Sequence, residues 1–412
     1  MVYSHGGDIY GSEHIRIDFS VNTNPLGTPR EVIEAVASSR EEILLYPDSQ
    51  CRGLRKALAA FHGLPEDWIL CGNGAADLIF GLAEALRPRR AVLFAPCFSE
   101  YEAALSLKGC EIIQIPLRPE ENWLPDARCL ERKLERVGGA DLVFLGNPNN
   151  PTGMALSSEE LEVFAGICRN HHALLAVDEC FNGFLERPEG FTMAGKLGRY
   201  RNLFLLNAFT KTYGMAGLRL GYAMCADTGL LERLAAVRQP WSVSGIAQKA
   251  GIAALSRRDF LEQARELIAR ERKFLSDGLS RLGFRVWPSM ANYLLFSVGQ
   301  KGKELSGQED LKKFLSGRGI LIRSCASYRG LDDSFFRVAV KRREENKELL
   351  SQMEEWARKT SAPAARFKRR AGEGEDDSSK NPIWLHTVYR KGERNGKTNH
   401  DPGDHVKRWK KA

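Results

Sequence analysis

Seven short apolar runs between residues 68 and 225 most constrain the fold of this 412-residue chain. Consecutive positions in each run are largely apolar, a pattern typical of strands buried on both faces of a mainly parallel sheet. Helical patterns intervene, for example over residues 75–86 and 157–172. This alternation predicts an α/β fold with crossover helices. The seven predicted strands cover residues 68–71, 91–95, 112–116, 141–146, 173–178, 203–208 and 220–225.

The second part of the chain has a different sequence pattern. A charged helical pattern over residues 258–283 leads into short predicted strands and two further helical patterns, which together predict a smaller α+β domain. Because single hydrophobic cores stop growing near ~250–300 residues, a chain of this length is expected to fold into more than one domain. We expect an N-terminal arm with part of the small domain over residues 1–45, a large domain over 46–257, a small domain over 258–360, and a tail over 361–412.

The formal net charge of +8 is concentrated at the C-terminal end. Residues 362–412 carry 13 Lys and Arg against seven Asp and Glu, so the rest of the chain is nearly neutral. The tail lacks sustained periodicity, and its composition predicts disorder. Its three histidines (His386, His400 and His405) match no compact metal site, so we expect no metal. Its end at residues 407–410 is basic and aromatic, a composition that could bind nucleic acid or an acidic partner. We favour a disordered, solvated tail over that interpretation.

The nine cysteines are scattered, odd in number and without a CxxC pair, which argues against a disulfide framework and a thiolate metal site. No apolar run reaches the ~18 residues that a membrane span needs. The N-terminus lacks a basic region followed by an apolar one, so we expect a cytoplasmic protein that does not bind membranes.

Four polar features follow predicted strands, and parallel strands end at the sheet edge where α/β proteins bind ligands. A Gly-Asn-Gly turn at residues 72–74 precedes a helix, whose free N–H groups favour a phosphate. Asn150 lies in the loop 146-GNPNNPTG-153, Asp178 ends one strand, and Lys211 follows another. Each alone has an ordinary interpretation as a turn, a loop, a helix cap or a surface charge. Together they indicate one site.

The order and spacing of these motifs, with 207-NAFTKTYGMAGLRLGY-222, resemble the fold-type I pyridoxal 5'-phosphate enzymes, in the aminotransferase group related to histidinol-phosphate aminotransferase. The resemblance spans residues 3–358 and implies a large domain with a mainly parallel seven-stranded sheet plus a smaller α+β domain. It implies that Lys211 forms the Schiff base with the cofactor and that Asp178 holds the pyridinium N–H. Asn150 would bond the ring's phenolic oxygen, and Phe98 would stack on the ring.

The resemblance also implies how the cofactor phosphate is held. Arg219 would bind it beside the backbone amides of Gly74, Ala75 and Ala76. Tyr46 resembles a tyrosine that reaches the phosphate of the partner subunit, which implies a homodimer with shared active sites.

The chain departs from its relatives at three positions of this site. Relatives often carry a hydroxyl residue where Ala208 and Ala75 stand, and a tyrosine where Phe181 stands. Phe181 cannot donate to the ring oxygen, and the two alanines remove hydroxyls from the phosphate site. We expect Thr210 and Arg219 to hold more of the phosphate in their place.

Both ends of the chain narrow the expected reaction. The start 5-HGGDIYG-11 paired with 320-ILIRSCASYRGLDDSFFRVAVK-341 resembles the family members that decarboxylate L-threonine O-3-phosphate to (R)-1-amino-2-propanol O-2-phosphate for cobalamin biosynthesis. This implies a pyridoxal phosphate-dependent carboxy-lyase with a phosphorylated amino acid as substrate. The residues that the resemblance places around the substrate are His5, Gly6, Asn22, Asn150, Arg323 and Arg337.

Two alternatives stay open at this point. One is transamination like that of histidinol-phosphate aminotransferases, which share the central motifs and the final arginine. The other is decarboxylation of O-phosphoserine, which differs from O-phosphothreonine by one methyl group, a difference that a pocket discriminates by only ~1–3 kcal/mol.

Overall fold

The computed structural model describes residues 6–10, 14–299 and 310–361, which belong to one compact unit. The predictions for His5 and for the tail from residue 362 therefore lie outside the described residues. No helix in these described ranges is both long enough and apolar enough to cross a membrane.

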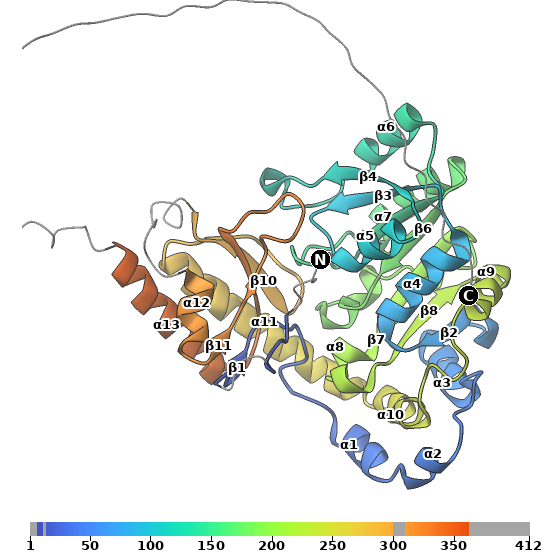
Figure 1. The fold of residues 1–412 in the computed structure, drawn as a ribbon, viewed down its shortest axis with the longest axis horizontal. Helices are drawn as coiled ribbons and strands as arrows, with labels where there is room; N and C mark the ends of the chain where they lie inside the picture. The colour runs from blue at the N-terminus through green and yellow to red at the C-terminus, as the bar shows by residue number, and fades with distance from the viewer. Residues whose placement is uncertain (1–5, 11–13, 300–309, 362–412) are drawn as a thin grey trace, which may run out of the picture. The chain divides into compact units, whose positions relative to one another are not determined.

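A seven-stranded sheet forms the centre of the larger part of the molecule, and all seven predicted strands are confirmed (Figure 1). The strand order is β2-β8-β7-β6-β5-β3-β4. Neighbours pair in parallel except at β8, which is antiparallel to both β2 and β7. The strands are β2 (Ile69–Gly72), β3 (Arg90–Ala95), β4 (Glu111–Pro116), β5 (Leu142–Gly146), β6 (Leu174–Asp178), β7 (Leu203–Ala208) and β8 (Gly221–Cys225).

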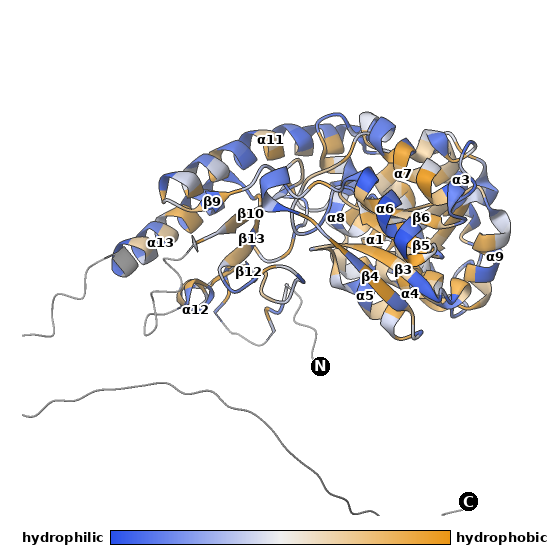
Figure 2. Ribbon diagram, turned by 90° about the horizontal axis from the view of Figure 1, so that it is seen from above, coloured by the Kyte–Doolittle hydropathy of each residue, from blue (hydrophilic) through white to orange (hydrophobic). Residues whose placement is uncertain are grey.

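Helices cover both faces of this sheet, which explains why its strands are apolar at consecutive positions. Successive side chains point to opposite faces, so Val92 and Leu93 belong to different cores. Figure 2 shows the strands as predominantly hydrophobic and the helices as mixed. One face packs on α4 (Gly74–Leu86), α5 (Ser99–Ser106) and α9 (Thr228–Ala236). The other packs on α3 (Arg52–His62), α6 (Ala127–Val137), α7 (Ser158–Asn170) and α10 (Gly245–Leu255).

A second sheet of four antiparallel strands, in the order β12-β13-β10-β9, lies beside the first part (Figure 1). A separate hydrophobic core packs its helices against it. The strands are β9 (Arg285–Val286), β10 (Tyr293–Ser297), β12 (Arg323–Ser324) and β13 (Phe335–Ala339), and the helices are α11 (Arg258–Arg281), α12 (Leu311–Ser316) and α13 (Arg343–Ser361). The domain boundaries at residues 45 and 257 stay a prediction.

The N-terminal segment connects the two sheets. Its strand β1 (Ile17–Asp18) pairs in parallel with β11 (Ile320–Leu321), and it then crosses to the turn after β7. There the Asn24 side chain donates to the Thr212 carbonyl at 2.7 Å, and its backbone N–H donates to the Lys211 carbonyl at 3.1 Å. A Cβ at Gly214, where φ is +63°, would lie 2.4 Å from the Gly27 carbonyl oxygen, so this close crossing requires glycine.

Candidate active site

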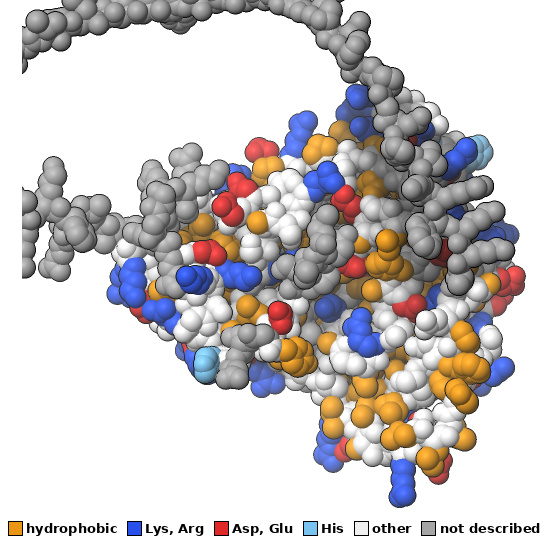
Figure 3. Space-filling view, in the orientation of Figure 1, with side chains coloured by type: hydrophobic (Ala, Val, Ile, Leu, Met, Phe, Trp, Pro, Cys, Tyr) orange, Lys and Arg blue, Asp and Glu red, His pale blue; other side chains and the backbone are white. Residues whose placement is uncertain are grey.

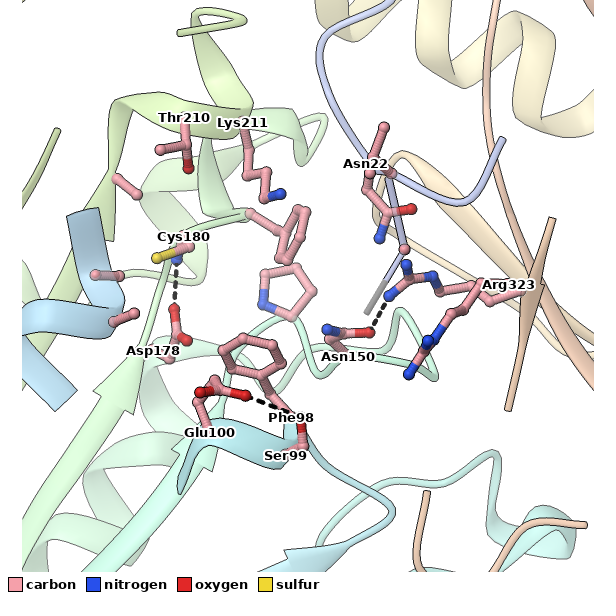
Figure 4. A pocket seen from close by; sticks show the side chains of 18 of the residues that line it. Asn22, Phe98, Ser99, Glu100, Asn150, Asp178, Cys180, Thr210, Lys211 and Arg323 are labelled. Atoms are coloured by element: carbon pink, nitrogen blue, oxygen red, sulfur yellow. Dashed lines mark hydrogen bonds between the residues drawn. The ribbon is translucent and has the colours of Figure 1, made fainter. Parts of the chain in front are cut away.

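A cavity of about 400 Å³ lies at the carboxyl edge of the seven-stranded sheet and reaches the four-stranded sheet (Figure 4). The parallel strands bring their C-terminal ends to this edge, and antiparallel β8 begins there. The structure places thirteen of the predicted residues around this cavity. They are Gly6, Asn22, Ala75, Ala76, Phe98, Asn150, Asp178, Phe181, Thr210, Lys211, Arg219, Arg323 and Arg337.

Lys211 lies in the short helix α8 (Phe209–Thr212) directly after β7, and its amine points into the cavity (Figure 4). Desolvation, followed by the positive charge of Arg337, lowers the Lys211 pKa to about 8, although Cys180 and Asp178 act in the opposite direction. A substantial fraction of the amine is therefore neutral in mildly basic solution. A neutral amine can act as a nucleophile and accept a proton.

Asp178 ends β6 with both carboxylate oxygens engaged. The Tyr101 hydroxyl donates to Oδ2 at 2.7 Å, and the Cys180 backbone N–H donates to Oδ1 at 3.0 Å. Burial, followed by the Asp178 charge, raises the pKa of Tyr101 well above its usual value, so the phenol stays a donor. Tyr101 in turn stacks on Phe144 with ring centres 4.0 Å apart. The carboxylate is thus held in one orientation, with lone pairs remaining for an N–H in the cavity.

A candidate phosphate site lies where the N-terminus of α4 meets Arg219. Gly74 begins the helix with φ at +81°, and a Cβ there would lie 2.9 Å from Nη2 of Arg219. Glycine therefore lets the guanidinium group approach the turn closely. Free N–H groups of the helix, the Thr210 side chain and the arginine suit a phosphate. Ala75 and Ala208 also line the site and contribute no hydroxyl group.

The loop that carries Asn150 is held by its own asparagines. Asn147 accepts from the Leu156 N–H at 2.7 Å and donates to the Leu156 carbonyl at 3.0 Å. Asn149 donates to the Pro96 carbonyl and to the Thr152 hydroxyl, both at 3.0 Å. These buried hydrogen bonds fix the loop at the sheet edge.

Arg337 fixes the orientation of the Asn150 amide. Its Nη1 donates to Asn150 Oδ1, and its Nη2 donates to the Ser20 carbonyl at 2.7 Å. Because the amide oxygen is engaged, Nδ2 is the group that can donate to a ligand. In the described part of the chain, Arg337 Nε and Asn22 Oδ1 are buried without a hydrogen-bond partner. Such orphaned groups are costly, and a polar ligand would satisfy them.

Arg323 and Arg337 lie directly opposite each other on antiparallel β12 and β13. Both are largely buried, with 8% and 6% of their surface exposed. Like charges at opposed positions of a sheet are destabilising, and each guanidinium lies 5.5 Å from the centre of a tyrosine ring, Tyr328 and Tyr293 respectively. Two adjacent buried cations form a strong site for anions.

Smaller residues and aromatic rings shape the remaining walls. A Cβ at Gly6 would lie 2.4 Å from the Ser20 carbonyl oxygen, so glycine is needed for that approach. Phe98 precedes α5 and contacts Tyr101 edge-to-face, with ring centres 5.6 Å apart. Phe181 makes a similar contact with Tyr293 at 5.0 Å. These rings make the cavity partly apolar, as a planar ligand requires.

Tyr46 does not line the cavity. Its side chain is 81% exposed, and its ring lies 4.8 Å from that of Trp241. Its role toward a partner subunit stays a prediction. Sequence reasoning missed Tyr101 and Tyr328, because the contacts of each depend on segments far away in the chain: 77 residues separate Tyr101 from Asp178 and 178 separate Tyr328 from Asn150. A tyrosine at a helix or loop position carries no signal of such a contact.

The family model described as "Aminotransferase class I and II" matches residues 14–353. The chain belongs to the class I and II aminotransferase family. It is 35% identical over 356 residues to the threonine-phosphate decarboxylase of Salmonella typhimurium, covering 84% of this chain and 95% of that protein. It is also 35% identical over 340 residues to the histidinol-phosphate aminotransferase of Symbiobacterium thermophilum, covering 82% and 89%.

Among solved structures, the histidinol-phosphate aminotransferase of Clostridium acetobutylicum matches with a TM-score of 0.76 and 28% identity, covering 83% of this chain and 99% of that one. The predicted fold class, a fold-type I architecture with a mainly parallel seven-stranded sheet, is confirmed.

Proposed function

We propose that this protein decarboxylates L-threonine O-3-phosphate to (R)-1-amino-2-propanol O-2-phosphate, with pyridoxal 5'-phosphate as cofactor, for cobalamin biosynthesis. The observation that carries the proposal is the pair of opposed buried arginines, Arg323 and Arg337, in the same cavity as Lys211. A substrate with a phosphate and a carboxylate matches two adjacent guanidinium groups. The likeness to a threonine-phosphate decarboxylase over 95% of its length supports the reaction.

The cavity fits the cofactor at each of its polar groups. The N-terminus of α4, Thr210 and Arg219 would hold the phosphate, and Asp178 would accept the ring N–H. The Asn150 amide would donate to the phenolic oxygen, because its own oxygen is bonded to Arg337. When bound, pyridoxal phosphate supplies an electron sink for the pair of electrons left at Cα.

The protein's own residues would then orient the substrate and transfer one proton. Between them, the two arginines would anchor the phosphate and orient the carboxylate, so that the bond to Cα that breaks is the one to carbon dioxide. Lys211 Nζ would return a proton to Cα after carbon dioxide leaves. The lowered Lys211 pKa of about 8 suits this task, since the amine can gain and lose a proton near neutral pH.

Transamination of histidinol phosphate is the second candidate, and the equal 35% identity to a histidinol-phosphate aminotransferase favours keeping it. Decarboxylation of O-phosphoserine is a variant of the main proposal that differs by one methyl group. The same assay with each substrate separates the three.

We also propose a homodimer in the cytoplasm. Exposed apolar side chains gather over α1 (Arg30–Ala37), α2 (Arg40–Leu44) and the segment after it, where Figure 3 shows a hydrophobic surface. They include Ile33, Ile43, Leu44, Leu45, Tyr46 and Trp241. Exposed patches of this kind mark interaction sites, and Tyr46 would reach the cofactor phosphate of the partner subunit. Sedimentation equilibrium should give twice the chain mass, whereas a monomer with full activity would contradict the shared site.

The test of the proposed function is to incubate the purified holoenzyme with O-phosphothreonine and measure carbon dioxide and the amine product. We expect equal amounts of both. The proposal would be wrong if no carbon dioxide is released and the enzyme instead transfers the amino group of histidinol phosphate to 2-oxoglutarate. That result would support the second candidate.

A further inference from the structure

Tyr328 lies between the two arginines and the cofactor-facing asparagine. It belongs to the turn between β12 and β13, where its N–H donates to the Cys325 carbonyl at 2.9 Å. Its hydroxyl donates to Asn150 Oδ1 at 3.3 Å and accepts from Arg337 Nη1 at 3.5 Å. The side chain is largely buried and lines the cavity. One phenol therefore contacts the group that would face the cofactor and the group that would face the substrate.

The ring of Tyr328 makes a third contact. The Arg323 guanidinium lies 5.5 Å from its centre. The face of an aromatic ring attracts a cation, so the ring helps to hold Arg323, whose Nη2 also donates to the Ser327 hydroxyl at 3.1 Å. The hydroxyl meanwhile lies 3.5 Å from Arg337 Nη1, which also donates to Asn150. Tyr328 thus contacts both members of a pair of like charges that would otherwise repel each other.

We propose that Tyr328 is a positioning residue that sets the spacing between the Arg323 and Arg337 guanidinium groups and thereby selects substrates by the distance between their phosphate and carboxylate. The inference rests on the proposed function and adds a specificity determinant to it. A substrate whose two anionic groups are one methylene further apart, such as O-phosphohomoserine, fits the fixed pair less well. A variant in which the spacing of the two guanidinium groups is less fixed should discriminate less between the two substrates.

Two variants separate the hydroxyl from the ring. Tyr328→Phe keeps the ring under Arg323 and removes the hydrogen bonds to Asn150 and Arg337, so kcat/KM for O-phosphothreonine should fall about fivefold. Tyr328→Leu removes both contacts, and the fall should reach roughly 30-fold, mainly through KM. The kcat/KM ratio of O-phosphothreonine to O-phosphohomoserine should fall about tenfold in Tyr328→Leu.

Tyr200→Phe is the matched control. Tyr200 is also buried beneath guanidinium groups, with Arg169 and Arg199 at 5.4 and 5.3 Å from its ring centre, and it does not line the cavity. We expect wild-type selectivity in this variant. A role of Tyr328 in folding alone would lower the rates for both substrates by the same factor and leave the ratio unchanged, and that result would overturn the proposal.

A second readout needs no turnover. The dissociation constant of inorganic phosphate for the holoenzyme, measured by titration calorimetry, should rise about fivefold in Tyr328→Leu and stay at the wild-type value in Tyr200→Phe. If wild-type protein releases no carbon dioxide, the proposed function fails, and this measurement still decides the role of Tyr328. Equal phosphate affinity in wild type and Tyr328→Leu would overturn it.

Discussion

The two sides of the cavity differ in how the chain builds them. On the side of the seven-stranded sheet, Asn150, Asp178 and Lys211 lie at or just after the C-terminal ends of adjacent parallel strands, so the topology alone brings them to one edge. On the side of the four-stranded sheet, Arg337 comes from an antiparallel strand and bonds to Ser20, which is 317 residues away in the sequence. The first side depends on local strand–helix turns, and the second depends on long-range contacts between buried charges. We expect changes on the first side to affect cofactor chemistry and changes on the second to affect substrate binding.

The largest effect should come from the cofactor side. Lys211→Ala removes the amine that would bind the cofactor covalently and move the proton, so kcat should fall by at least ~10³-fold. Carbon dioxide release and the visible absorbance of the bound cofactor measure the two losses. Lys273→Ala, an exposed lysine paired with Asp277 at 2.8 Å, is the control and should keep wild-type activity. Wild-type turnover in Lys211→Ala would show that the reaction does not depend on this lysine, and would contradict the role given to the cofactor side.

The next effect should come from the substrate side and appear mainly in KM. Arg337→Lys keeps the charge and loses the planar fork that bonds Asn150 and Ser20 together, so KM should rise about 10–100-fold. Arg318→Lys, at a partly exposed ion pair with Glu355, serves as control. A fall in kcat with unchanged KM would contradict the division of labour between the two sides.

The pH dependence of cofactor binding tests how the two sides are coupled. With a Lys211 pKa of about 8, the neutral fraction of the amine rises roughly 15-fold from pH 6.5 to 8, and the rate of reconstitution of the apoprotein should follow it. Arg337 lowers that pKa, so Arg337→Met should raise it and move the profile to higher pH. A profile that stays in place would show that the arginine does not act on the lysine.

The smallest effect concerns the phosphate site, where Ala75 and Ala208 contribute no hydroxyl group. Ala75→Ser adds a donor at the N-terminus of α4 and should tighten cofactor binding about fivefold. Ala60→Ser, exposed in α3, is the matched control. A dissociation constant that is unchanged or higher would mean that Thr210 and Arg219 already satisfy the phosphate.

The same contrast explains what the sequence could predict. The seven strands and the residues that follow them could be read from apolar runs and from Asn-Pro and glycine turns, because short-range spacing fixes both. The opposition of Arg323 and Arg337 depends on the register of β12 against β13, and the contacts of Tyr328 depend on where a turn folds back. Single positions in the sequence carry neither kind of information. Tyr101, which orients Asp178, was missed for the same reason.

A direct comparison of two reactions in one preparation tests the central claim. The holoenzyme is given O-phosphothreonine in one assay, and histidinol phosphate with 2-oxoglutarate in another, and kcat/KM is measured for each. We expect one carbon dioxide per O-phosphothreonine consumed and a kcat/KM for this reaction that far exceeds that for amino transfer. A higher kcat/KM for amino transfer, with no carbon dioxide from O-phosphothreonine, would contradict the account.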